Sequence, residues 1–230
     1  MRRFAPDLAT ILVLALAAGG LWAFLELGDA VGEGDWTGFD SAVMLALRAQ
    51  DDLSDPVGPH WVEIAMRDVT GLGGVALLTL VVIGGAIWLW LRRDAGTALY
   101  LVAATGLGML LSPLFKTLYD RPRPDLVPHG TLVSSASFPS GHTLMATVVW
   151  LTLGLLVARR VERRRERGFV LTIAVCIALA VGISRVYLGV HWPTDVLAGW
   201  ALGAVWALLW AQGARLLARR GRLRGAEGGD

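Results

Sequence analysis

The chain has 230 residues, of which 55% are hydrophobic, and its formal net charge is +2. Its mean hydropathy is +0.57. The small net charge gives no general affinity for nucleic acid. The hydrophobic residues are clustered in nearly uncharged stretches of about 20 residues, the length that crosses about 30 Å of hydrocarbon. These totals exclude an ordinary soluble domain and predict a polytopic membrane protein.

Six stretches have the length and hydropathy of membrane-spanning helices. The first follows Arg2 and Arg3, so a cleaved signal peptide is the alternative for that stretch. Its apolar run is longer than a typical signal core, and the sequence around Glu26 is a poor cleavage site, which favours a retained helix. The expected fold class is therefore all-α. The spans are expected at about residues 8–27, 71–91, 96–115, 141–158, 169–188 and 195–217.

The arginines predict how the chain is oriented. They precede the first span, connect spans two and three, connect spans four and five, and follow the sixth. With six spans, all four arginine-rich segments fall on one side, and the positive-inside rule places that side in the cytoplasm. We therefore expect a multi-pass protein of the cytoplasmic membrane, with both termini in the cytoplasm. The arginines are Arg2, Arg3, Arg92, Arg93, Arg159, Arg160, Arg163, Arg164, Arg165, Arg167, Arg215, Arg219, Arg220, Arg222 and Arg224.

The opposite, outer side receives three connecting segments. The longest, residues 28–70, is acidic, and two of its stretches have the pattern of helices lying at the membrane interface: Phe39–Gln50 and His60–Asp68. Whether this segment is a simple cap or helps to admit a lipid stays open. The final residues, 221–230, are Gly-rich without an apolar pattern and are expected to be disordered, which makes residues 1–220 one six-span domain.

Polar residues gather where the outer segments meet the spans. Lys116, the single lysine, begins such a segment, Arg123 follows it, and Arg185 ends the fifth span. Each cation alone is most simply an anchor whose charge reaches the interface. Together with the free N–H groups of a helix start at Ser140 and Gly141, the cations have the composition of a phosphate site.

Two histidines lie in the same outer segments. Phosphoryl transfer needs a nucleophile and a group that protonates the leaving oxygen, and His142 and His191 have the chemistry for both. The residues alone leave open which one attacks. Asp195 follows His191 by one helical turn and can fix its tautomer, which favours His191 as the nucleophile.

A metal site is the competing interpretation of this spacing. His191 and Asp195, four residues apart, could ligate a metal ion. No third ligand lies at suitable spacing nearby, and the surrounding cations would repel a divalent ion, so we expect neither a metal nor another cofactor. Asp120 and Arg121 could pair with each other or steady the loop, and neither is expected to be catalytic.

Three motifs occur in order along this part of the chain. Lys116–Pro124 reads K-x6-R-P, Pro139–His142 reads P-S-G-H, and Ser184–Asp195 reads S-R-x5-H-x3-D. They resemble the three-part signature of the type 2 phosphatidic acid phosphatase (PAP2) superfamily. The resemblance implies a bundle of six transmembrane helices and a metal-independent membrane lipid phosphatase that acts through a phosphohistidine.

The resemblance also implies a role for each matching residue. His191 would be the nucleophile, Asp195 would orient it, and His142 would protonate the leaving oxygen. The residues that would bind phosphate are Lys116, Arg123, Ser140, Gly141 and Arg185.

The expected substrate is a lipid phosphate or pyrophosphate presented by the bilayer at the outer face. Undecaprenyl pyrophosphate, phosphatidate and phosphatidylglycerophosphate are the leading substrates, with a slight preference for the first because it is released on that face. A phosphotransferase that passes the phosphoryl group to a lipid or sugar hydroxyl is one alternative. A non-enzymatic anion transporter is another, disfavoured because several spans are nearly devoid of polar residues. No nucleic-acid partner is expected, and the oligomeric state stays open.

Overall fold

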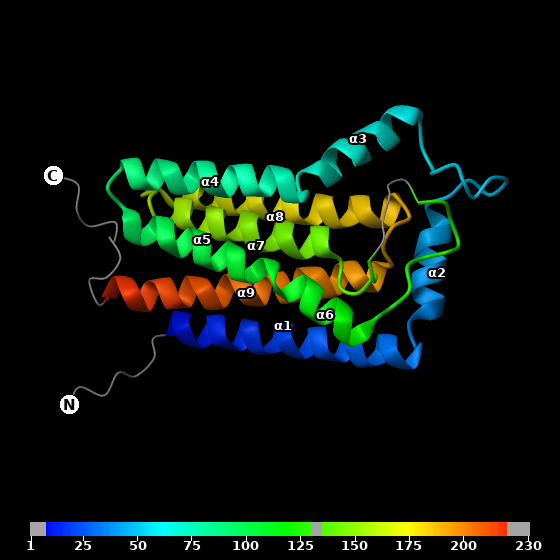
Figure 1. Cartoon of the computed structure of the whole chain (residues 1–230), viewed down its shortest axis with the longest axis horizontal. Coiled ribbons are helices and arrows are strands. Elements are labelled where there is room, and N and C mark those ends of the chain that lie inside the picture. Colours follow the sequence, from blue (N-terminus) through cyan, green and yellow to red (C-terminus); the bar gives the residue numbers. More distant parts are fainter. Residues whose placement is uncertain (1–7, 130–134, 220–230) are drawn as a thin grey trace.

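The structure is a computed structural model, and it describes residues 8–129 and 135–219. Within these residues every regular element is a helix (Figure 1). The helices are α1 (Leu8–Glu33), α2 (Thr37–Ala46), α3 (His60–Gly71), α4 (Val75–Leu91), α5 (Ala95–Met109), α6 (Leu111–Tyr119), α7 (Gly141–Ala158), α8 (Arg164–Tyr187) and α9 (Pro193–Arg219). The expected all-α fold class is confirmed.

Within residues 8–129 and 135–219, five helical stretches are long and apolar enough to cross a membrane, and a bent pair brings the number to six. α1, α7, α8 and α9 are single helices, and α5 with α6 forms one continuous stretch over Ala95–Tyr119. The bent pair is α3 and α4, which meet at 47° around residues 72–74. The second span therefore does not begin as the uninterrupted helix expected from residue 71, because Gly73 and Gly74 interrupt the helix there.

The two largest differences between expected and observed helix boundaries are at α1 and α8. α1 continues six residues beyond the expected end of the first span, to Glu33. α8 begins at Arg164, five residues before the expected start of the fifth span. Both extensions add polar residues that a hydropathy pattern assigns to loops. α7, by contrast, begins and ends at the residues expected for the fourth span. The tail from 221 lies outside the described residues.

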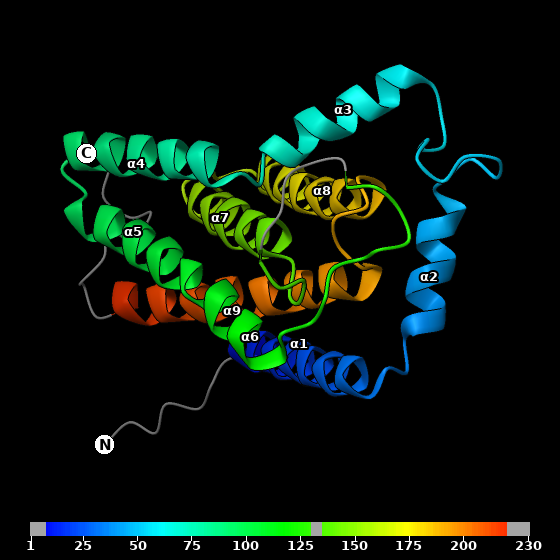
Figure 2. The same ribbon diagram turned by 45° about the vertical axis from the view of Figure 1, so that its right-hand side comes forward.

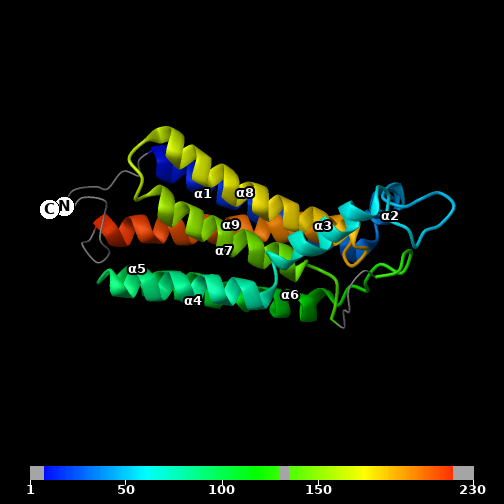
Figure 3. The ribbon, with the colours of Figure 1, turned by 90° about the horizontal axis from the view of Figure 1, so that it is seen from above.

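α7 is the central helix of the bundle. It packs against α4, α5, α8 and α9 (Figures 1 and 3). α9 approaches it closely at Gly199 and Gly203: a Cβ at Gly199 would lie 3.0 Å from Cβ of Thr143, and one at Gly203 only 2.7 Å from Cβ of Thr147. Small residues four apart let two helix backbones come together in a bilayer. This contact brings the N-termini of α7 and α9, and hence the second and third motifs, side by side.

The end of the bundle that carries these N-termini is covered by the acidic segment. α2 lies across that end, roughly perpendicular to the long helices, and α3 leans away from the bundle (Figure 2). α2 is shorter than the helix expected at Phe39–Gln50, since it ends at Ala46. It is anchored by Met44, which is buried with Val127, Val186 and Val196. A segment far from the three motifs in sequence therefore closes over them.

Candidate active site

The second and third motifs are joined by a backbone hydrogen bond. The amide of Ser140 donates to the carbonyl oxygen of Asp195 at 3.0 Å. His142 lies two residues after Ser140, and His191 lies four residues before Asp195. Each histidine is within electrostatic range of the other. The two imidazoles therefore lie on the same end of the bundle and near one another, as a shared phosphate requires.

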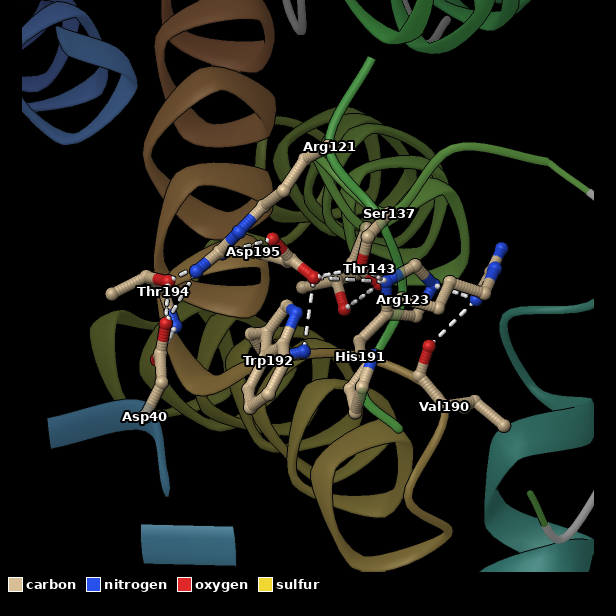
Figure 4. Close-up of polar contacts among 12 residues, drawn as sticks. Asp40, Arg121, Arg123, Ser137, Thr143, Val190, His191, Trp192, Thr194 and Asp195 are labelled. Atoms are coloured by element: carbon tan, nitrogen blue, oxygen red, sulfur yellow. Dashed lines mark hydrogen bonds and ion pairs between the residues drawn. The ribbon is translucent and has the colours of Figure 1, made fainter. Parts of the chain in front are cut away.

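His191 has a defined orientation and a deducible tautomer (Figure 4). Its Nε2 lies 3.3 Å from Nη1 of Arg123, and its Nδ1 lies 3.4 Å from Oδ2 of Asp195. A guanidinium has only donors, so Nε2 must be the accepting nitrogen and Nδ1 must carry the proton. The lone pair needed for nucleophilic attack is therefore on Nε2, on the side of Arg123.

Burial keeps His191 uncharged. The residue is 1% exposed. Removal from water lowers its pKa to about 4, although the hydrogen bond and the negative charge of Asp195 act in the opposite direction. Burial also lowers the pKa of Arg123, which remains a cation at neutral pH because an arginine starts from a pKa of 12.5. At neutral pH the site thus presents a neutral imidazole beside a positive charge.

Asp195 is held by more contacts than the histidine alone provides. Its Oδ2 accepts from the hydroxyl of Ser137 and from the backbone amide of Trp192, the latter at 2.9 Å. Its Oδ1 accepts from Nη1 of Arg121 at 2.6 Å. These contacts fix the carboxylate as well as the imidazole next to it. Ser137 lies just before the second motif, and nothing in the motif pattern pointed to it.

Arg121 connects Asp195 to the acidic segment. While Nη1 contacts Asp195, Nη2 donates to Oδ2 of Asp40 on α2 at 2.7 Å. Asp40 is fully buried and also accepts from the amide and the hydroxyl of Thr194, at 2.9 and 2.6 Å. Asp40 was not singled out from the sequence, and Arg121 was expected only to pair with Asp120 or to steady its loop. The one signal available was a carboxylate, Asp40, within the apolar pattern of a predicted interfacial helix.

Two of the predicted phosphate-binding cations converge on one residue of the outer loop. Lys116 Nζ donates to the hydroxyl of Ser135 at 2.8 Å, and Arg123 Nε donates to the carbonyl oxygen of Ser135 at 2.7 Å. Arg123 also donates to the carbonyl oxygen of Val190 at 2.6 Å. All these acceptors are neutral. The charges of both cations are held in place without being neutralised.

Arg185 is the most deeply buried of the three cations. It is 3% exposed, and its Nη1 donates to the hydroxyl of Thr70 at 2.9 Å, while its Nε has no hydrogen-bond partner among the described residues. Arg185 takes part in none of the ion pairs between described residues. A buried cation left in this state is costly unless an anion binds beside it.

The start of α7 adds backbone donors to this cationic region. Ser140 is the N-cap residue but its side chain makes no capping hydrogen bond, and its hydroxyl oxygen instead accepts from Thr143 at 2.9 Å. An uncapped helix start favours an anion. A Cβ at Gly141 would lie 2.9 Å from the hydroxyl oxygen of Ser112, so this tight contact favours glycine. His142 lies in this first turn, in electrostatic range of Lys116, Arg123 and Arg185.

Within the described residues, no group of three or more His, Cys, Asp and Glu side chains is arranged to hold a metal ion. His191 and Asp195 instead contact each other, and the second oxygen of the carboxylate is engaged by Arg121. The donor set that surrounds the histidines is cationic and rich in N–H groups, which suits an anion and not a cation.

Comparisons with known proteins agree with these observations. A model of the PAP2 superfamily matches residues 97–217. Phosphatidylglycerophosphatase B of Bacillus subtilis is 40% identical over 147 residues, which cover 62% of this chain and 70% of the relative. Undecaprenyl-diphosphatase BcrC of the same organism is 31% identical over 130 residues, covering 53% of this chain and 61% of the relative.

A solved structure is similar over most of the chain. The crystal structure of a transmembrane PAP2-type phosphatidylglycerolphosphate phosphatase from Bacillus subtilis matches with a TM-score of 0.79 and 30% identity, covering 88% of this chain and 98% of the other. The matched family region includes all three motifs, while Asp40 lies before it. The family match, the relatives and the fold lead to one conclusion: the chain belongs to the PAP2 superfamily, and the relatives described above are phosphatases of lipid phosphates.

Proposed function

We propose that this chain, a membrane lipid phosphatase, removes a terminal phosphate from a lipid phosphate or lipid diphosphate through a phosphohistidine at Nε2 of His191. The observation that carries the proposal is the surroundings of that nitrogen. It belongs to a neutral, buried imidazole, oriented through Asp195, and it faces Arg123, whose described acceptors include no carboxylate. Such a site attracts a phosphate and offers it a nucleophile.

The first step forms one bond and breaks another. Nε2 of His191 attacks phosphorus, the bond from phosphorus to the lipid oxygen breaks, and His142 gives its proton to the departing oxygen. The positive charge that develops on the His191 ring is stabilised by Asp195 through Nδ1. Lys116, Arg123 and Arg185, with the first N–H groups of α7, would bind the charged oxygens of the phosphoryl group as it transfers.

The second step regenerates the enzyme. Water attacks phosphorus while His142 accepts a proton from it, the bond from phosphorus to Nε2 breaks, and inorganic phosphate leaves. His142 is then protonated and His191 neutral, the states in which the two residues meet the negatively charged phosphate of the next substrate. In this scheme the cations and the two histidines supply every group that the reaction needs, so the proposal involves no metal.

Asp40 is proposed as a positioning residue for the nucleophile. It acts through Arg121, which bridges it to Asp195. This gives the acidic segment a role that the sequence left open, since α2 would orient the imidazole by closing over the N-terminus of α9.

The proposed orientation places this end of the bundle outside the cytoplasm. The connections from α4 to α5 and from α7 to α8 lie at the opposite end, and they carry Arg92, Arg93, Arg159 and Arg160 (Figure 1). The positive-inside rule assigns that end to the cytoplasm, with both termini. The lipid would then place its headgroup at the histidines while its acyl or prenyl chains stay in the bilayer.

The proposed substrates are those for which similar proteins are named. One relative is a phosphatidylglycerophosphatase and another an undecaprenyl-diphosphatase, and both substrates present a terminal phosphate on a membrane lipid. The test is phosphate release by purified protein from phosphatidylglycerophosphate, undecaprenyl pyrophosphate and phosphatidate, compared side by side. We expect release from at least one of these lipids by the wild type and none by His191→Ala.

Two outcomes of this assay would contradict the proposal. One is release by the His191→Ala variant at the wild-type rate, with the variant inserted and as thermally stable as the wild type. The other is dependence of release on an added lipid or sugar acceptor, which would make the protein a phosphotransferase.

A further inference from the structure

A cavity of about 750 Å³ lies at the end of the bundle opposite the histidines. It is bounded by the last turns of α4, α7 and α9, the beginning of α5 and an early turn of α1. Its volume falls in the range of sites that hold small molecules or lipid headgroups. The reaction proposed above makes no use of this part of the molecule.

The wall of the cavity is strongly cationic. Among the described lining residues there is one carboxylate, Asp94, and five arginines: Arg92, Arg159, Arg160, Arg167 and Arg215. Asp94 is already engaged, because Arg160 Nη2 contacts its Oδ2 at 2.5 Å. The cavity therefore retains a positive charge that its own acidic residue does not neutralise.

Three of these arginines have a described contact with a neutral group. Arg159 Nη2 donates to the carbonyl oxygen of Ala211 at 2.5 Å, Arg167 Nε donates to that of Val161 at 2.6 Å, and the Arg92 guanidinium lies 5.7 Å from the ring centroid of Trp88. Burial lowers the pKa of Arg159, and the charge of Arg215 acts in the same direction. An anion bound between these groups would relieve their repulsion.

A buried amide supplies an unused acceptor in the same wall. Gln212 is 7% exposed, and its Nε2 donates to the hydroxyl of Thr10 at 2.9 Å. Its Oε1 has no hydrogen-bond partner among the described residues. A buried carbonyl oxygen left in this state is costly, and it suits a ligand that brings a hydroxyl or N–H donor.

Apart from Thr97 and Tyr100, the rest of the wall is apolar. It includes Leu89, Leu155, Leu156, Leu208 and Trp88. A fully hydrated small anion gains nothing from such a surface, whereas an amphiphile with a charged head and hydrocarbon chains matches both parts. Basic pockets between transmembrane helices near the cytoplasmic side typically bind anionic lipid headgroups.

We propose that this cavity is a second lipid site, which binds the headgroup of an anionic phospholipid and is separate from the site at the histidines. The phosphate of such a lipid is a diester, so it has no terminal phosphoryl group for the proposed reaction. The arginines contact the phosphate, Gln212 accepts from a headgroup hydroxyl, and the chains lie along the leucines. A bound phospholipid would hold the ends of α4, α7 and α9 together.

The test measures binding of fluorescent phosphatidylglycerol to the purified full chain in a neutral detergent, with phosphatidylcholine as the zwitterionic comparison. We expect phosphatidylglycerol to bind more tightly. The double variant Arg92→Gln, Arg159→Gln should bind it roughly tenfold more weakly, because two charges at the headgroup are lost. Arg165→Gln is the matched control, since Arg165 is exposed at the same end and does not line the cavity.

Two further variants complete the test. Arg123→Ala removes a cation at the histidines and should leave phosphatidylglycerol binding within about twofold, which separates the two sites. If the double variant does not fold, Arg92→Gln alone decides, because Arg92 lies in the turn after α4 and is exposed. It should weaken binding by roughly threefold to fivefold.

Equal affinity for the two lipids would overturn the proposal. So would a loss in Arg165→Gln as large as the loss in the cavity variants, since binding would then follow the general charge of the surface. A loss in Arg123→Ala as large as that in the double variant would place the bound lipid at the histidines and not in this cavity.

Discussion

Arg121 and Arg185 are both arginines at the histidine end of the bundle, yet their surroundings are opposite. Arg121 is 13% exposed and lies between two buried carboxylates, Asp40 at 2.7 Å and Asp195 at 2.6 Å. Arg185 is more deeply buried, but within the described residues it contacts only the hydroxyl of Thr70 and leaves Nε unpaired. The charge of Arg121 is compensated by carboxylates, whereas no carboxylate among the described residues pairs with Arg185.

The difference assigns different roles to arginines of one cluster: a structural role to the compensated cation and a role in binding phosphate to the uncompensated one. A compensated cation holds its partners in place, so Arg121 fixes the carboxylate that orients His191. An uncompensated one lowers the stability of the free protein and gives binding free energy when a phosphate arrives. The same logic applies to Lys116 and Arg123, whose described acceptors are neutral.

Substituting the two arginines gives the largest contrast. Arg185→Ala should lower kcat/KM by roughly 10²–10³-fold without lowering Tm, because it removes a contact to the transferring phosphoryl group and an uncompensated buried charge. Arg121→Ala should instead lower stability by about 3–5 kcal/mol, because it leaves two buried carboxylates unpaired. Kinetics and thermal unfolding of both variants check this, and equal Tm losses would remove the distinction between them.

The next largest effect is expected from Asp40→Asn, which changes one of the two carboxylates that compensate Arg121. The amide keeps the size of the side chain but loses the charge that holds Arg121, so Asp195 and His191 become less well positioned. We expect kcat to fall roughly tenfold with KM nearly unchanged. Asp35→Asn is the matched control because Asp35 is exposed on the same outer segment. A change confined to Tm would reduce Asp40 to a structural role.

A smaller effect is expected from pH. The neutral form of His191 is the nucleophile, and burial lowers its pKa to about 4. This group should therefore cause no loss of kcat/KM between pH 8 and 5, and a roughly tenfold loss for each pH unit below 4. The pH profile of kcat/KM for the wild type measures this. An acid limb near pH 6.5 would mean that His191 titrates as an ordinary exposed histidine.

Chelation is expected to have no effect at all. The reaction proposed above is carried by imidazoles, cations and helix N–H groups, so EDTA should leave the rate of phosphate release unchanged. The measurement is turnover before and after dialysis against EDTA. If EDTA abolishes turnover and magnesium or zinc restores it, the site binds a metal ion and the metal-independent mechanism is wrong.

The sequence predicts helix boundaries well where they are set by hydropathy. It predicts the fold less well where glycines or contacts between distant segments set the direction of a helix. α7 has the bounds expected for the fourth span because an apolar stretch there is bounded by Ser140 and Arg159. The sequence predicts α3 and α4 as separate helices, at His60–Asp68 and from residue 71, but it does not predict the 47° angle between them. Hydropathy carries no information on backbone direction at such a break.

The residues of the site also fall into two groups, those that the sequence predicts and those that it does not. Lys116, His142 and His191 could be named because motif residues of unusual type recur at helix ends. Asp40 could not, because its contact with Thr194 joins residues 154 positions apart. The role of Arg121 was missed for the same reason. A local pattern reveals the residues that carry reactive groups, but the partners that hold them depend on the packing of α2 over α9.

The central claim is that a covalent phosphoryl group forms on Nε2 of His191, and trapping it is the most direct test. The wild type would be mixed with a lipid substrate labelled at its terminal phosphate, quenched in base within one turnover, and digested for mass spectrometry. The account predicts an acid-labile phosphate on the peptide that contains His191, absent from His191→Ala. A label on His142, or turnover of the substrate without any labelled histidine, would contradict it.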